Sequence, residues 1–335
     1  MQAEEGRMAG AAVAAVVAAL AITATPNAHA QKAPGAYSYP TRPIRLVVPT
    51  AAGGGVDTAA RIVGHALTER WSQQVVVDNR AGGSGIIGSE IVSHAASDGY
   101  TLLIAPTTFS TSKSLFRKLP YDPLRDFRPI SLVSNEPNVL VTPPALPVAS
   151  VSDLVALGRR EPRRLNYGFG GIGSTASLCG ALFRLKTGIS MTAVSYKGNG
   201  PAVNALVAGE TQVMFVGLPP TLSLIKSGKL RGLAVTSSQR SVFLPETPTI
   251  AEGGVPDFEV TNWIGILAPS RTPQPIVQKL NGEIVRILAT PAVKERFSSH
   301  GVVPHSTTPE EFGRFLAREF ARWEHVIKAS GITPN

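Results

Sequence analysis

The residues of this sequence that are suited to chemistry are glycine turns rather than reactive side chains. The apolar run Ile44–Val48 and Pro49 are followed by a turn made of Thr50, Ala51, Ala52, Gly53, Gly54 and Gly55. Glycines leave the backbone N–H groups uncovered, and the apolar residues after the turn recur at helical spacing. A glycine turn that opens a helix binds anions, because unpaired N–H groups and the helix dipole point at the same spot.

Two further turns follow the same plan in the first half of the chain. The segment NRAGGSGIIG (79–88) places Gly82, Gly83 and Ser84 before a helix expected over 84–96, and Thr107 and Thr108 follow the strand expected over 101–105. Strands that alternate with helices predict a parallel sheet with helices on its faces. Right-handed crossovers bring the loops 49–56, 78–85 and 106–112 to one edge of that sheet, where α/β folds bind ligands.

The second half repeats the pattern after a proline-rich segment. We expect residues 113–147 to be an irregular connection with one strand over 138–141, which carries the chain into a second lobe. Beyond a helix over 150–160, two short strands end in the turns GFGGIGST (168–175) and YKGNGP (196–201). From these turns we take Gly171, Ser174, Thr175, Tyr196 and Gly198 as candidate ligand contacts. The predicted division is lobe 1 at 31–142 plus 262–335 and lobe 2 at 143–261.

Each candidate also has a plainer interpretation. The glycines of 53–55 and 82–85 suit any tight turn, and Tyr196 suits simple packing. Asp57 is included among the ligand-binding candidates, but we favour a structural role for it. A carboxylate in the first helical turn stabilises the helix dipole, and it repels a bound carboxylate.

The first 30 residues predict an export signal. Residues 11–24 are continuously apolar apart from Thr23, which is too short to span a bilayer, and Ala28-His29-Ala30 is a small-x-small cleavage pattern. We expect cleavage after Ala30 and a periplasmic location. Glu4 and Glu5 weaken the usual positive start, so translation from Met8, a disordered tail and a membrane anchor remain alternatives.

Composition argues for binding rather than catalysis. Cys179 is the single cysteine, so no internal disulfide is possible, and we expect it in the core. The six histidines form no metal-ligand pair, and no dinucleotide motif, P-loop or nucleophile elbow occurs. We therefore expect no metal, no cofactor and no catalytic residue. The formal charge of +9 suits anionic ligands, and the scattered basic residues do not indicate nucleic-acid binding.

Ordered motifs across residues 40–332 resemble a known family, the Bug receptors, which are the periplasmic substrate-binding proteins of tripartite tricarboxylate transporters. The motifs are PTAAGGGVDTAAR (49–61), DNRAGGSGIIG (78–88), DGYTLLIAPTT (98–108), LPYDPLRDFRPISLV (119–133), SYKGNGPAVNAL (195–206), IKSGKLRGLAVTSSQRS (225–241) and LPETPTIAEGG (244–254). The resemblance implies a type II periplasmic binding fold, α/β in class, whose two lobes close on a small carboxylate. It also implies that loops 49–57 and 82–85 grip one carboxylate through backbone N–H groups and ordered water, with the second lobe supplying the remaining contacts.

The chain departs from the family pattern at several polar positions. Thr50 replaces an aromatic residue, Phe109 and Ser112 replace His and Asn, Ser177 replaces a His, and Ala205 and Gln212 each replace an Asp. If Thr50, Ser177 and Ala205 line the cleft, its far wall is neutral, and a second ionised carboxylate there is costly. We therefore expect a monocarboxylate, or an acid with an apolar or aromatic body, in preference to citrate. Lys113 and Lys197 favour the opposite outcome if either points inward.

The leading hypothesis is a monomeric receptor that delivers an organic carboxylate to membrane transporter subunits. One alternative is a sensory partner of a membrane kinase, which the sequence does not separate from a transport receptor. Another is an exported α/β transferase that uses the same glycine turns, against which the lack of an activated nucleophile argues.

Overall fold

The computed structural model describes residues 39–171 and 173–331, so the predicted export signal lies outside the described residues. The fold below is that of the compact unit that begins at Pro40. Its first strands are β1 (Ile44–Val48), β2 (Val75–Asn79) and β3 (Thr101–Pro106), which pair in parallel in the order β2-β1-β3. The helices α2 (Gly55–Trp71) and α3 (Ile86–Ser93) connect them, with a short 3₁₀ turn, η2 (Gly83–Gly85), before α3. The parallel sheet predicted for this region is confirmed.

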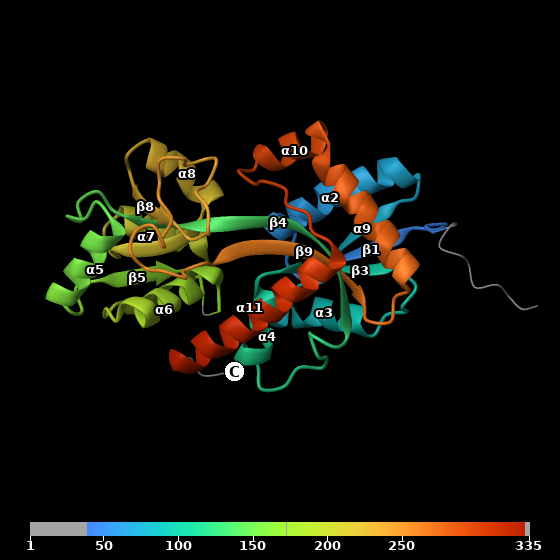
Figure 1. The fold of residues 1–335 in the computed structure, drawn as a ribbon, viewed down its shortest axis with the longest axis horizontal. Helices are drawn as coiled ribbons and strands as arrows, with labels where there is room; N and C mark the ends of the chain where they lie inside the picture. Colours follow the sequence, from blue (N-terminus) through green and yellow to red (C-terminus); the bar gives the residue numbers. More distant parts are fainter. Residues whose placement is uncertain (1–38, 172, 332–335) are drawn as a thin grey trace, which may run out of the picture. The chain divides into compact units, whose positions relative to one another are not determined.

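Two long strands join the two halves of the unit. β4 (Phe127–Thr142) and β9 (Thr261–Pro269) are antiparallel partners, and β9 also pairs with β3. The C-terminal part of β4 pairs with β7 (Val213–Gly217) on one side and β8 (Arg231–Val235) on the other. The nine-stranded sheet is therefore mixed, with parallel strands toward both ends and antiparallel pairs in the middle (Figure 1).

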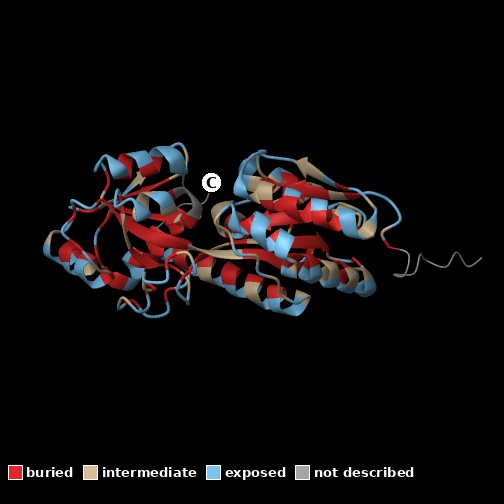
Figure 2. Cartoon of the chain, turned by 90° about the horizontal axis from the view of Figure 1, so that it is seen from above, coloured by how far each residue is buried: buried red, intermediate tan, exposed pale blue. Residues whose placement is uncertain are grey.

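The second half repeats the strand-turn-helix plan. β5 (Asn166–Phe169) pairs in parallel with β6 (Thr192–Ser195) and with β7. The surrounding helices are α5 (Val151–Arg160), α6 (Thr175–Thr187), α7 (Asn199–Val207) and α8 (Leu218–Lys226). Alternate residues of one strand enter different apolar clusters: Leu140 packs with α5 and α6, whereas Val139 and Val141 pack with α7 and α8. The two-residue repeat of a strand thus buries both faces of the sheet between helices (Figure 2).

The C-terminal helices are α9 (Gln274–Ala289), α10 (Pro291–Ser298) and α11 (Pro309–Ala329). A capping box opens α11, because Thr308 Oγ1 accepts from Glu311 N and Glu311 Oε2 accepts from Thr308 N. The apolar stripe of α11 enters two clusters. Phe312, Leu316 and Phe320 pack with β3 and β9, whereas Trp323, Val326 and Ile327 pack with α5 and α6. α11 therefore packs against both halves of the unit.

Three elements differ from the expectation. β4 begins at Phe127, within the segment expected to be irregular, and α4 (Thr108–Leu115) lies in a region expected to be a loop. α7 begins at Asn199, within the turn expected over 196–201. Pro129 and Pro137 lie where β4 pairs only with β9, so a missing N–H leaves one side of the ladder intact. Across the described residues, no helix is long and apolar enough to cross a membrane.

Candidate functional site

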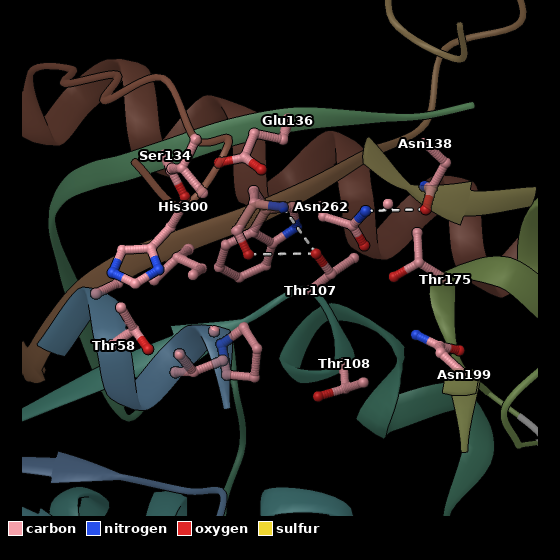
Figure 3. A pocket seen from close by; sticks show the side chains of 18 of the residues that line it. Thr58, Thr107, Thr108, Ser134, Glu136, Asn138, Thr175, Asn199, Asn262 and His300 are labelled. Atoms are coloured by element: carbon pink, nitrogen blue, oxygen red, sulfur yellow. Dashed lines mark hydrogen bonds between the residues drawn. The ribbon is translucent and has the colours of Figure 1, made fainter. Parts of the chain in front are cut away.

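A cavity of about 600 Å³ lies where several helices begin, over the two long strands. Its apolar wall includes Val56, Ile62, Trp263, Ile264 and Phe297. Hydroxyl, amide, carboxyl and imidazole groups supply the polar side chains, and among the described residues no lysine or arginine lines the cavity. Figure 3 shows the polar side chains at its edges: Thr58, Thr107, Thr108, Ser134, Glu136, Asn138, Thr175, Asn199, Asn262 and His300.

Five helix N-termini converge on this cavity. Gly55 and Val56 open α2, Thr108 opens α4, Thr175 and Ala176 open α6, Asn199 opens α7, and Gly217 is the N-cap of α8. The first N–H groups of a helix have no acceptor within the helix, and its N-terminus carries a partial positive charge. α8 contributes mainly through this charge, because the prolines at 219 and 220 have no N–H. The cavity therefore attracts anions without a cationic side chain, which explains how a wall free of Lys and Arg can bind a carboxylate.

Asp57 organises the first glycine turn from outside the cavity. Its carboxylate is buried and accepts from Gly53 N at 2.9 Å, Asn79 Nδ2 at 3.0 Å and Arg61 Nε at 3.0 Å. Burial alone raises the pKa of this carboxyl, but the hydrogen bonds from Arg61, Gly53 and Asn79 outweigh it and hold the pKa below its usual range. Asp57 thus positions the loop and does not line the cavity, which agrees with the structural role favoured from the sequence.

Asn79 fixes the same loop from the neighbouring strand. Its side-chain amide donates to Thr50 O at 3.1 Å as well as to Asp57. Gly53 adopts φ +86°, a left-handed conformation that favours glycine, and its N–H is already bound to Asp57. The N–H groups of Gly55 and Val56, the first helical residues, have no acceptor within the helix and face the cavity side of this turn.

The floor of the cavity comes from the long strands. Ser134, Glu136 and Asn138 alternate along β4, so their side chains lie on one face, and Asn262 lies opposite Glu136 in register on β9. Asn262 Nδ2 donates to Asn138 Oδ1 at 2.9 Å. Thr107 lines the cavity too, but its Oγ1 accepts from Trp263 N at 2.8 Å and donates to Trp263 O at 3.2 Å, which ties β3 to β9 (Figure 3).

Glu136 is the one carboxyl group that lines the cavity in the described part of the chain. It is half-buried, and no hydrogen bond or ion pair joins it to another described residue. Burial raises the pKa of this carboxyl from its usual value to about 8. Glu136 is therefore mainly protonated at neutral pH, and it can both donate and accept a hydrogen bond.

The cavity contains six of the predicted ligand residues: Gly53, Gly55, Thr107, Thr108, Ser174 and Thr175. The other predicted residues do not line it: Thr50, Ala51, Ala52, Gly54, Asp57, Gly82, Gly83, Ser84, Gly171, Tyr196 and Gly198. Residues 82–84 shape a turn that contacts α4, and all three have positive φ. Tyr196 packs beside the α7 cluster, as in the plainer interpretation given above.

The predicted site did not include the polar residues of the two long strands, β4 and β9. Ser134, Glu136, Asn138 and Asn262 lie in β4 and β9, and His300 follows the end of α10. The polar alternation of Ser134, Glu136 and Asn138 was a usable signal, because polar residues two apart share one face of a strand. The prolines on either side concealed it by favouring an irregular segment.

The residues that depart from the family pattern do not line the cavity, although the expectation of a monocarboxylate assumed that they do. Thr50, Ser177 and Ala205 do not line the cavity. Ser177 is buried, accepting from Gly173 N and donating to Ser174 O, and Ala205 lies in the buried face of α7. Lys113 and Lys197 are also absent from the cavity wall. The three departures therefore do not alter the wall of this cavity, where the N-termini of α6 and α7 supply positive potential.

The single cysteine of the chain does not line the cavity. Cys179 is fully buried in the core, as expected, and burial together with the charge of Glu319 raises the pKa of its thiol, which keeps it protonated. No group of His, Cys, Asp and Glu side chains in residues 39–171 and 173–331 is placed to hold a metal ion.

Comparison with known proteins gives a consistent result. Residues 59–332 match the family model described as tripartite tricarboxylate transporter family receptor (TctC). BugT of Bordetella pertussis is 39% identical over 298 residues, which cover 88% of this chain and 91% of BugT. A solved R. palustris protein with adipate is 38% identical, with a TM-score of 0.75 over 89% of this chain and 100% of that one. MatC of Rhodopseudomonas palustris with bound malate is 31% identical, with a TM-score of 0.71 over 86% of this chain and 100% of MatC.

Proposed function

The chain belongs to the tripartite tricarboxylate transporter receptor family, and we propose that it captures a small dicarboxylate in the periplasm and delivers it to the membrane subunits of such a transporter. As a member of a receptor family it is a binding protein, not an enzyme. The observation that carries the ligand class is the convergence of five helix N-termini from both halves of the unit on one cavity. Each half thus offers backbone N–H groups for one carboxylate.

The apolar part of the cavity wall narrows the class of ligand further. The apolar surface of Val56, Ile62 and Trp263 suits a short hydrocarbon chain between two acid groups. Adipate and malate, bound by two similar proteins, are both acids of this kind. We therefore propose a linear dicarboxylate in place of the monocarboxylate expected from the sequence, with one acid group at α2 and α4 and the other at α6 and α7.

A thermal-shift panel tests this function. Mono-, di- and tricarboxylates are added at pH 7, and adipate and malate represent the proposed class. A ligand at a hundred times its Kd adds about 2.7 kcal/mol of stability, or roughly 5 °C in Tm for a chain of this size. The expected result is that dicarboxylates give the largest shifts. No shift from any acid contradicts the proposed function, and larger shifts from aromatic monocarboxylates contradict the proposed class.

We also propose that the divisions 31–142 plus 262–335 and 143–261 act as two lobes that close on the ligand. Support comes from the cavity itself, since α2 and α4 belong to one division and α6 and α7 to the other. Only a ligand that contacts both divisions binds the closed state better than the open one, and this difference drives closure.

Small-angle X-ray scattering checks the closure. The radius of gyration should fall when a saturating dicarboxylate is added, because the closed state makes the contacts to both ends of the acid. A variant that cannot bind the acid serves as the control and should show no change. An unchanged radius for the wild-type protein with bound ligand contradicts the hinge.

We further propose that the chain is exported with a signal peptide cleaved after Ala30 and acts as a monomer. The support for export is the apolar run 11–24 with its small-x-small end, together with membership of a family of periplasmic receptors.

A further inference from the structure

We propose that Glu136 contacts the bound dicarboxylate in its protonated form, donating a hydrogen bond to the ligand, so that capture of the dianion takes up a proton at alkaline pH, where Glu136 of the free protein is ionised. This inference rests on the proposed function and adds a specificity residue and a pH dependence to it.

The position of Glu136 makes it a ligand contact. Its side chain leaves β4 on the face that carries Ser134 and Asn138, and all three line the cavity (Figure 3). β4 and β9 are the strands that join the two halves of the unit, so the floor they form lies between the two sets of helix N-termini. An acid that bridges both sets passes over this floor.

Among the described residues, no lysine or arginine lines the cavity around Glu136. Asn262, opposite it in register, is neutral, and the helix starts around the cavity present hydroxyl and amide side chains. His300 is the other titratable side chain on the cavity wall among the described residues. His305 lies on the segment bridged to Ser134, and Glu319 and Arg322 of α11, which packs on β4, form an ion pair with each other.

An ionised Glu136 would repel a dicarboxylate bound in the cavity. An ionised Glu136 facing a dianion is a like-charge contact in a desolvated cavity, which disfavours either the ion or the complex. Protonation removes the repulsion and supplies a donor to an oxygen of the ligand, giving a hydrogen bond to a charged group. The raised pKa of Glu136 in the unliganded protein is consistent with this state, and burial alone causes it. The proton comes from solvent, so no other reactant is needed.

The affinity should therefore fall with pH in a defined way. If only the protonated form binds, Kd rises about tenfold between pH 7 and pH 9, because the carboxyl loses its proton around pH 8. Calorimetry with adipate and with malate at pH 8.5, in two buffers of different ionisation enthalpy, should show uptake of roughly three quarters of a proton per ligand.

Three variants test whether Glu136 is the group that takes up the proton. Glu136→Gln keeps a donor and cannot titrate, so its Kd should be the same at pH 7 and pH 9 and its proton uptake should vanish. Glu246→Gln, an exposed acid outside the cavity, is the matched control and should behave as wild type. His300→Gln tests the imidazole, and proton uptake should survive in it. Circular dichroism checks that each variant is folded.

The outcomes are distinct. Binding by wild type without proton uptake, or uptake that persists in Glu136→Gln, overturns the proposal and leaves the proposed function in place. Loss of binding in folded Glu136→Gln with proton release in wild type also overturns it, because Glu136 would then pair as an anion with a cationic group of the ligand. No binding of any acid by the wild-type protein overturns the proposed function, and this inference with it.

Discussion

Replacing Gly55 by valine should abolish ligand binding while the protein stays folded. Gly55 is the first residue of α2 and lines the cavity, and a Cβ built on it meets no atom within 4 Å. The added Cβ therefore meets no protein atom, and the valine side chain is expected to occupy the space through which a carboxylate reaches the N–H groups of Gly55 and Val56. We expect a loss of affinity of at least about 100-fold, or roughly 3 kcal/mol.

The neighbouring glycine provides the matched control. Gly54 is the N-cap of α2, has a negative φ and does not line the cavity, and its Cβ would lie 3.9 Å from Ala51 O. Gly54→Ala should bind a dicarboxylate within a few-fold of wild type. Titration calorimetry and Tm measurements on both variants decide the matter. Unchanged affinity in a folded Gly55→Val protein would show that the acid does not approach the start of α2.

Replacing Glu136 by glutamine should stabilise the unliganded protein at high pH. The pKa of Glu136 is raised from 4.5 to about 8 in the folded state by burial. Between these values the unfolded chain has released the proton that the folded protein retains, so wild-type stability falls as pH rises through this window and levels off above pH 8. Glutamine has the same shape and no charge, and therefore escapes this loss.

The size of the gain in stability and its dependence on pH test whether the raised pKa of Glu136 causes it. The full pKa shift corresponds to roughly 5 kcal/mol, and access of water to the cavity reduces it, so we expect a gain of about 2–4 kcal/mol at pH 9 and almost none at pH 4.5. Denaturant unfolding of wild type, Glu136→Gln and Glu246→Gln at several pH values measures it. A constant difference between wild type and Glu136→Gln from pH 4.5 to pH 9 would show that Glu136 ionises normally in the folded state.

The sequence by itself determined the local plan of this protein. Each glycine turn follows an apolar run and precedes residues at helical spacing, and both features depend only on neighbouring residues. β1, α2 and β3 therefore lie close to where they were predicted. The class of ligand followed from the same logic, because a helix N-terminus attracts anions wherever it is placed. The motif order was sufficient to indicate the family.

The tertiary structure decided which of these turns form the cavity. The loops after β1, β3 and β5 contribute Gly55, Thr108 and Thr175, whereas the 82–84 turn does not line the cavity, a distinction that depends on how helices pack across the sheet. It also placed Glu136 and Asn262, which are more than a hundred positions apart, side by side on antiparallel strands. Burial at that junction is what raises the pKa of Glu136, and burial is a property of the assembled fold, so the charge state of the cavity floor could not be deduced from sequence spacing.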